Sequence, residues 1–224
     1  MNKSKTHPII DAPVETAKII KAYTWWSKLY FLFAPMEKKA RTRGIELARI
    51  HPDDKVLEVA VGTGYSFHEI LKRVGRENTV YGIDLTPAML EKTKKRVSRK
   101  GYSNFELIEG DARHMSFPDG SFDVLYNSFM LDLIPIADFP VILGEFRRVL
   151  KKDGRLVLVN LSKKDTTPDF VEKLYTRLYN MNPYIWGGCR PVFMESYVNQ
   201  TGFRNVKREV PKTIHLSEIV IATK

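Results

Sequence analysis

The 224-residue sequence contains a single cysteine, Cys189, and no long apolar run. One cysteine excludes an internal disulfide and a cysteine-based zinc site, and it fits a reducing compartment. The longest strongly apolar segment lies near Leu29 to Met36, which is far too short to span a bilayer. The start, MNKSKTHPII, is basic, but the apolar core of a signal peptide does not follow it. We therefore expect a cytoplasmic protein.

Acidic residues are outnumbered, and the formal net charge is +10. Residues 1–50 alone carry ten Lys/Arg against four Asp/Glu. A positive surface suits nucleic acid, anionic lipid or an acidic substrate, and the alternative is an ordinary solvated surface rich in lysine. Hydrophobic residues make up 43% and charged residues 28%, as in a globular protein with a substantial core.

From Lys55 onward, strand and helix patterns alternate. Short apolar or alternating runs predict seven strands, at Lys55–Val59, Thr79–Ile83, Phe105–Ile108, Phe122–Tyr126, Leu156–Val159, Phe203–Val210 and Ser217–Thr223. Helical spacing predicts helices after the first, second and fourth strands, including one from Pro87 with Thr86 as N-cap and one over Phe139–Leu150, and a turn precedes the fourth strand. This alternation is typical of an α/β fold with a mostly parallel sheet and helices on both faces. The short last connection favours an antiparallel final strand.

Two regions depart from this alternation. Residues 1–50 predict a helical leader before the sheet, and residues 51–224 predict the main domain. Within that domain, residues 165–192 predict an insert on the substrate side. Helices are expected there over Asp169–Met181 and beyond it over Pro191–Gln200.

The first predicted strand runs into a glycine turn, in the stretch KVLEVAVGTGYS at Lys55–Ser66. A glycine turn between a strand and a helix points backbone N–H groups at a ligand and permits its close approach. Dinucleotide enzymes need a third glycine, where this chain has Phe67, and Glu58 would repel a pyrophosphate. The same carboxylate would attract an ammonium group. The turn therefore favours a cofactor that carries an amino acid and an adenosine without a phosphate, and the alternative is a structural turn.

The stretch resembles the first motif of the class I S-adenosylmethionine-dependent methyltransferases, D/E-x-G-x-G-x-G. This chain has Glu58, then Ala60 in place of the first glycine, then Gly62 and Gly64. The resemblance implies a Rossmann-like fold and S-adenosylmethionine as cofactor. It also assigns positions in the later motifs: Asp84 accepts hydrogen bonds from the ribose hydroxyls, Leu85 and Met89 pack on the adenine, and Asp111, followed by Ala112, meets its amino group. Asn127 and Ser128 follow the fourth strand, and we expect them beside the methyl group.

The resemblance is strongest to the ubiquinone/menaquinone methyltransferase group and its phospholipid-methylating relatives. The run Ser27–Tyr30 resembles the leader of that group, which implies that Tyr30 closes over the cofactor. Phe31 stands where the group has an aspartate.

Methyl transfer needs a base only where the acceptor must lose a proton. Asp132, after the fourth strand, and His215, before the last, are the candidate catalytic bases. The alternatives are a cap for Asp132 and an exposed loop position for His215. No metal-binding cluster is evident. After the fourth strand, residues Asn127–Met130 have the sequence N-S-F-M, where enzymes that modify nucleic-acid bases have N-P-P-Y. This difference argues against a flipped nucleic-acid base as the substrate.

Aromatic side chains gather in the leader beside lysines: Tyr23, Trp25, Trp26, Tyr30, Phe31 and Phe33. They predict either core packing or peripheral contact with an anionic membrane. The predicted insert is also aromatic, which favours a small lipophilic substrate. We expect a methyltransferase acting on a molecule such as a quinone precursor. The alternatives are a phospholipid headgroup amine as acceptor, or a nucleic-acid-binding protein that retains the fold; a nucleotide-dependent oxidoreductase is disfavoured by Glu58 and Phe67.

Overall fold

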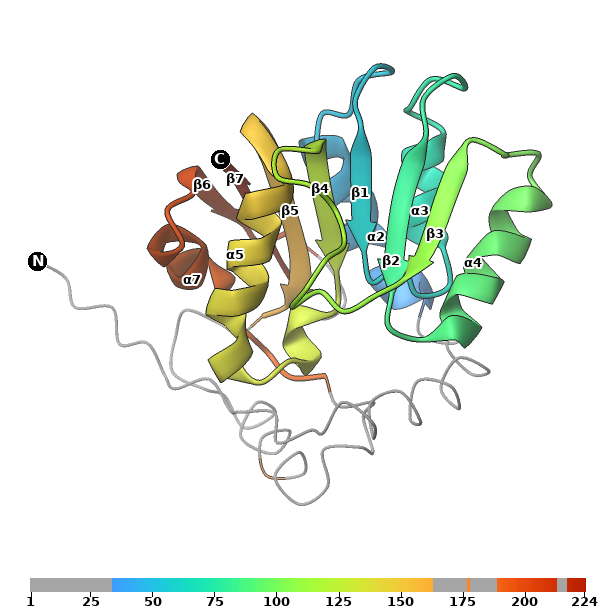
Figure 1. Ribbon diagram of the computed structural model, residues 1–224. Coiled ribbons are helices and arrows are strands. Elements are labelled where there is room, and N and C mark those ends of the chain that lie inside the picture. The colour runs from blue at the N-terminus through green and yellow to red at the C-terminus, as the bar shows by residue number, and fades with distance from the viewer. Residues whose placement is uncertain (1–33, 163–176, 178–188, 213–216) are drawn as a thin grey trace, which may run out of the picture.

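The computed structural model describes residues 34–162, 177, 189–212 and 217–224 (Figure 1). Seven strands form one sheet in the order β3-β2-β1-β4-β5-β7-β6. Their bounds are β1 Val56–Val59, β2 Val80–Asp84, β3 Phe105–Glu109, β4 Phe122–Ser128, β5 Leu150–Leu161, β6 Arg204–Glu209 and β7 Ser217–Thr223.

Strand direction agrees with the sequence prediction. The pairs β1–β2, β1–β4, β2–β3 and β4–β5 are parallel. The last strand, β7, runs antiparallel to both of its neighbours, β5 and β6. The chain thus forms the expected α/β sheet with an antiparallel final strand, and the strand order reverses beside β1, between β2 and β4. In open sheets of this kind, ligands bind outside the carboxyl ends of the strands at such a reversal.

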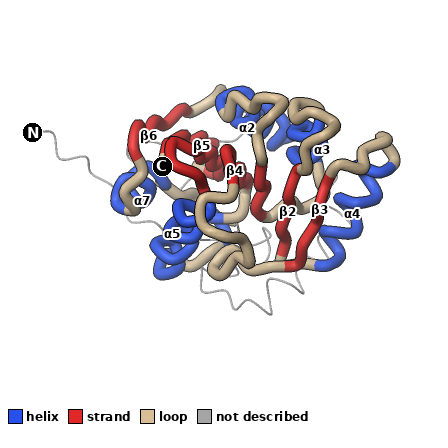
Figure 2. The backbone as a smooth tube through the Cα atoms, turned by 45° about the horizontal axis from the view of Figure 1, so that its top comes forward, coloured by secondary structure: helices blue, strands red, loops and turns tan. Residues whose placement is uncertain are grey.

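Helices cover both faces of the sheet, as Figures 1 and 2 show. The helices α2 (Ala34–Leu47), α3 (Tyr65–Leu71) and α4 (Pro87–Ser98) share one core cluster with residues of one sheet face. The helices α5 (Phe139–Val149) and α7 (Met194–Gln200) pack on the other face. In α5, the buried side chains Phe139, Ile142, Leu143, Phe146 and Val149 recur at helical spacing, which explains why this segment is a helix lying against a sheet.

Several element boundaries differ from the sequence prediction, including those of β4, β5 and α7. Strand β4 continues to Ser128, so Asn127 and Ser128 belong to the strand rather than follow it. Strand β5 already begins at Leu150, and the Asp153–Gly154 pair lies inside it as an irregularity in the pairing with β4. Helix α7 begins at Met194 rather than near Pro191. In each case pairing or docking to neighbouring elements determines where the element begins or ends.

Helix α2 lies close against the sheet because Gly44 has no side chain. A Cβ atom at this position would come within 2.6 Å of Val159 and 3.3 Å of the Tyr126 ring. The Tyr126 hydroxyl donates a hydrogen bond of 3.2 Å to the backbone oxygen of Arg41, one turn before. Close docking therefore fixes the helix that ends the predicted leader against the rest of the domain. Among the described residues, none of the helices is long and apolar enough to cross a membrane.

Candidate functional site

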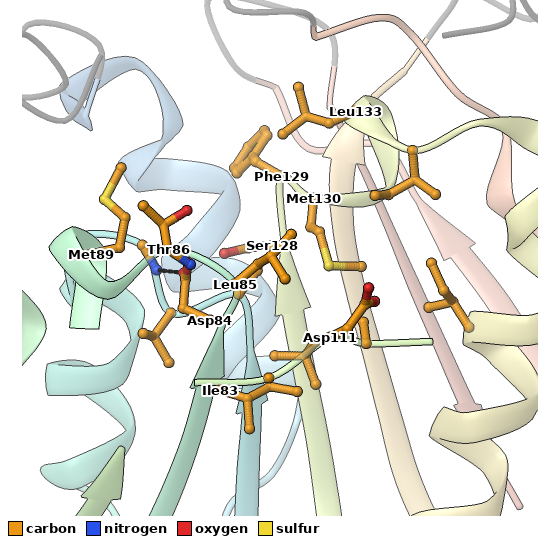
Figure 3. Close-up of a pocket in the computed structure, with 18 of the residues that line it drawn as sticks. Ile83, Asp84, Leu85, Thr86, Met89, Asp111, Ser128, Phe129, Met130 and Leu133 are labelled. Atoms are coloured by element: carbon orange, nitrogen blue, oxygen red, sulfur yellow. Dashed lines mark hydrogen bonds between the residues drawn. The ribbon is translucent and has the colours of Figure 1, made fainter. Parts of the chain in front are cut away.

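A pocket opens at the carboxyl ends of β1, β2, β3 and β4 (Figure 3). Its wall comes from the loops after these strands, from the beginning of α4 and from one side of α2. Figure 3 shows Asp84, Thr86 and Met89 on one side of this pocket and Met130 and Leu133 on the other. The pocket therefore lies at the position where the reversal of strand order predicts a ligand.

Hydrogen bonds to its backbone hold the loop after β1 on both sides. The Gly62 N–H donates to Asp84 Oδ2 at 2.8 Å, and the Gly64 N–H donates to the oxygen of Val61 at 2.9 Å. From α4, Thr93 Oγ1 donates to the Gly62 oxygen at 2.9 Å and Arg96 Nε to the Thr63 oxygen at 2.7 Å. These contacts satisfy the loop carbonyls on the side of α4 and fix the loop in one conformation.

Asp84 lies at the end of β2 and lines the pocket while only 7% exposed. Its Oδ1 accepts a second backbone hydrogen bond, from Thr86 at 2.9 Å (Figure 3). Burial raises the pKa of this carboxyl, and the two backbone N–H groups partly oppose that rise. Each carboxylate oxygen can accept a further hydrogen bond, so Asp84 keeps acceptor capacity toward a ligand in the pocket.

Glu58 does not line the pocket, although the sequence singles it out. It is 1% exposed and lies behind Val59 and Ala60, which do line the pocket. Its Oε2 atom is buried without a hydrogen-bond partner. Burial raises the pKa of this carboxyl well above its usual range; the charge of Arg41 opposes the rise and that of Asp84 adds to it. A second cation nearby would favour the ionised form further.

The wall nearest β3 carries Asp111 and Ala112, and Leu85 and Met89 lie along the β2 side. Asp111 is held by Arg113: the guanidinium donates to Asp111 Oδ2 at 3.0 Å and to Asp138 Oδ2 at 2.8 Å. All four residues expected on the adenine side therefore line the pocket.

Asn127, at the end of β4, is fully buried and lies outside the pocket wall. Its Nδ2 donates to the oxygen of Val59 at 2.8 Å, which ties β4 to the end of β1. Ser128, the next residue, does line the pocket. Beyond it the wall is apolar, formed by Phe129, Met130, Leu133, Ile134 and Ile142.

Asp132, the candidate base, lies in the short 3-10 helix Leu131–Leu133 and is fully buried. It does not line the pocket, whereas Leu133 beside it does. Its Oδ2 accepts a hydrogen bond of 3.3 Å from the N–H of Leu161, and its Oδ1 is buried without a partner. Burial raises the pKa of Asp132 to about 7. The buried Arg190 donates to the backbone oxygen of Asp132 at 2.9 Å and stabilises this turn.

Two residues singled out by sequence, Tyr30 and His215, lie outside the described residues. Among the residues that the structure does describe, no group of three or more His, Cys, Asp or Glu side chains is placed to hold a metal ion.

Ser128 lines the pocket as the sequence predicts, but several other pocket residues were not predicted: Glu37, Arg41, Thr63, Thr86, Arg113, Phe129 and Cys189. Thr63 lies between two motif glycines, so its place in the chain was a usable signal. Glu37 and Arg41 face the pocket from α2, and only the docking of that helix against the sheet brings them there.

The sheet order, the glycine loop and the acidic end of β2 define a Rossmann-like methyltransferase domain. A family model described as a methyltransferase domain matches residues 56–154. Among solved structures, an S-adenosylmethionine-dependent methyltransferase from Aquifex aeolicus superposes with a TM-score of 0.61 at 20% identity, over 94% of this chain and 98% of that one. A putative methyltransferase in complex with the Haloferax volcanii activator Trm112 gives 0.72 at 11% identity, over 92% and 96%. At these identities the structures show the fold.

Two curated relatives come from one group of methyltransferases, the ubiquinone/menaquinone biosynthesis enzymes. The ubiquinone/menaquinone biosynthesis C-methyltransferase of Teredinibacter turnerae is 34% identical over 139 residues, which cover 62% of this chain and 54% of that protein. The demethylmenaquinone methyltransferase of Listeria monocytogenes is 29% identical over 181 residues, 81% of this chain and 73% of the relative. The chain is similar to the class I S-adenosylmethionine-dependent methyltransferases, near the ubiquinone/menaquinone group, and these similarities indicate S-adenosylmethionine as the cofactor.

The pocket fits this cofactor by its own chemistry. Asp84 offers a fixed carboxylate for two hydroxyls, and Glu58 provides a buried oxygen without a partner near the end of β1. The glycine loop leaves no side chain where Gly64 turns into α3. A Cβ at that position would come within 2.8 Å of Thr93, so the loop and α4 pack at the closest distance that a glycine permits.

The loop also yields a stability prediction. Ala60 has a φ of 60°, a left-handed conformation that costs an L side chain about 1–2 kcal/mol. Glycine avoids that cost but gives up about 0.5–1 kcal/mol through the unfolded chain. We therefore expect Ala60→Gly to be neutral or up to about 1 kcal/mol more stable in urea unfolding. Ala40→Gly, in helix α2, is the control and should lose about 1 kcal/mol or more. A loss at Ala60 equal to that at Ala40 would contradict the strain argument.

Proposed function

We propose that this protein transfers the methyl group of S-adenosylmethionine to a small lipophilic acceptor of the quinone type. The observation that carries the proposal is the apolar wall directly beyond the cofactor loops, formed by Phe129, Met130, Leu133, Ile134 and Ile142. An apolar acceptor would gain free energy by leaving water for such a wall, and water would be excluded from the reacting atoms. The names of the two curated relatives agree with this acceptor class.

Each site residue would have a defined task. Asp84 would accept hydrogen bonds from the ribose hydroxyls, Leu85 and Met89 would pack on the adenine, and Asp111 and Ala112 would meet its amino group. The loop from Ala60 to Gly64 would let the backbone approach the cofactor, while Glu58 would favour the ammonium through its charge. Asn127 would keep β1 and β4 in register beneath the reacting groups.

The cofactor supplies an activated methyl group on a sulfonium, and the chain supplies alignment and a dry environment. The acceptor atom gains the methyl group and gives up a proton. We propose that Asp132 takes that proton through a bridging water, because it lies one residue from the pocket-lining Leu133 and because its carboxyl titrates in the neutral range. His215 remains the second candidate base.

The division of the chain belongs to the same proposal. Residues 1–50 would form a leader in which Tyr30 closes over the cofactor, residues 51–224 would form the catalytic domain, and residues 165–192 would be an insert on the substrate side. Cys189 lines the pocket, and Val192 forms a bridge with Ser162 beyond β5, which supports placing the end of the insert beside the acceptor. The protein would work in the cytoplasm, with the basic aromatic leader in peripheral contact with anionic lipid.

The test incubates the protein with lipid extract and S-adenosylmethionine carrying a labelled methyl group, followed by mass spectrometry. We expect label in a quinone-type product, and more of it when the acceptor is presented in anionic vesicles at low salt than in neutral ones. Calorimetry should show binding of S-adenosylhomocysteine and none of NAD. Label in phospholipid headgroups would overturn the acceptor class. A salt-dependent gel shift on nucleic acid without any labelled lipid would overturn the enzyme proposal.

A further inference from the structure

The two cationic side chains of the pocket, Arg41 and Arg113, lie at its two ends. Arg113 stands at the β3 end, where Asp111 and Asp138 hold its guanidinium. Arg41 enters from α2 at the β1–β4 end, where its guanidinium carbon lies 5.2 Å from the centre of the Phe129 ring. The two cations are therefore separated along the sheet, and Asp84 lies on the strand between them.

Arg41 is built into the pocket wall. It is 9% exposed, and its Nη2 donates to Glu37 Oε2 at 2.7 Å, one turn earlier on the same helix. Its backbone is fixed by the Tyr126 hydroxyl, and Gly44 lets the helix lie against the sheet. Burial raises the pKa of the nearby Glu58 carboxyl, and the charge of Arg41 opposes that rise. A guanidinium fixed in this way loses little side-chain freedom when it binds an anion.

The orientation of the cofactor follows from the order of the strands. With the ribose at Asp84 on β2 and the adenine at Asp111 after β3, the amino-acid part must extend toward β1 and β4. That part carries an ammonium and a carboxylate. At that end Glu58 supplies the negative charge and Arg41 supplies the positive charge. Arg113 lies at the other end of the pocket and does not reach this part of the cofactor.

We propose that Arg41 binds the carboxylate of the cofactor's amino-acid part, while Glu58 and Glu37 favour its ammonium. This inference rests on the proposed function and adds a binding residue to it. With the cofactor bound, the charges would alternate in sign: Glu37, Arg41, the cofactor carboxylate, the ammonium and, behind the pocket wall, Glu58. The guanidinium offers several donors in one plane, so it can keep Glu37 and still donate to a second carboxylate.

Calorimetry with three ligands tests the assignment. S-adenosylhomocysteine carries the carboxylate, decarboxylated S-adenosylmethionine lacks only that group among its charged amino-acid atoms, and methylthioadenosine lacks the whole amino-acid part. We expect Arg41→Gln to weaken S-adenosylhomocysteine binding about tenfold to a hundredfold. Binding of the other two ligands should change less than about twofold, since they make no contact with the lost charge. Arg41→Lys should recover part of the loss.

The matched control is Arg43→Gln on the same helix. Arg43 pairs with Glu46 and Glu209 and does not line the pocket. The Arg43→Gln variant should bind all three ligands as the unchanged protein does. An equal loss for every ligand in Arg41→Gln, or no loss for S-adenosylhomocysteine, overturns the inference while leaving the proposed function intact. Failure of the unchanged protein to bind S-adenosylhomocysteine overturns the proposed function, and this inference with it.

Discussion

Asp84→Ala is expected to lower the affinity for S-adenosylhomocysteine by about tenfold to a hundredfold, because hydrogen bonds to a charged acceptor contribute about 1.5–3 kcal/mol. The same change removes the acceptor of two backbone N–H groups, those of Gly62 and Thr86. Asp84 is 7% exposed, so those donors would be left nearly without water. We therefore also expect a lower melting temperature.

Two comparisons separate binding from folding at this position. Asp84→Asn keeps one acceptor oxygen and the shape of the side chain, so it should keep more stability than Asp84→Ala while losing the charge. A cofactor analogue without the ribose hydroxyls should bind the unchanged protein weakly. Its affinity should fall little further in either variant. If Asp84→Ala is folded and binds S-adenosylhomocysteine with unchanged affinity, the ribose contact is refuted.

The second large effect concerns Asp132. We expect Asp132→Asn to reduce the rate of methyl transfer by about a hundredfold to ten-thousandfold, the range for loss of a general base. In the unchanged protein, turnover should rise with pH through about 7, where burial places the pKa of this carboxyl. The rise should be absent from the asparagine variant, and cofactor affinity should be unchanged, because Asp132 does not line the pocket.

The same substitution, which should lower the rate of methyl transfer, should raise the melting temperature relative to the unchanged protein as the pH rises. The folded protein holds the Asp132 proton up to about pH 7, whereas the unfolded chain releases it near the ordinary pKa of 3.8. The contribution of this group to the free energy of unfolding therefore falls as pH rises from about 4 to about 7, and it stays low above that. The melting temperature of Asp132→Asn, relative to the unchanged protein, should thus increase by several degrees between about pH 5 and about pH 8.

Asp53→Asn removes an exposed carboxylate and is the control for both measurements. It should change neither the rate profile nor the pH dependence of melting. Turnover of Asp132→Asn close to that of the unchanged protein, with the pH profile retained, would assign the base elsewhere and return attention to His215.

Much of this fold could be predicted because the relevant signals are local. Parallel strands buried on both faces are mostly apolar runs, as in Val56–Val59, where Glu58 alone is polar, and the stripe of α5 repeats at helical spacing. Turn glycines such as Gly62 and Gly64 have positive φ values that few other residues tolerate. The end of β2, and with it Asp84, could be located in the same way. These properties depend on neighbours in sequence, so the amino-acid sequence by itself determined them.

The remaining properties depend on neighbours in space, which only the tertiary structure decided. Glu58 reads as a pocket residue in sequence, yet the sheet buries it behind Val59 and Ala60. Arg41 carries no motif, and it reaches the pocket only because α2 docks against β5 and Tyr126 through Gly44. The burial of Asp132 likewise comes from packing of distant segments, and desolvation by that packing is what raises its pKa into the neutral range.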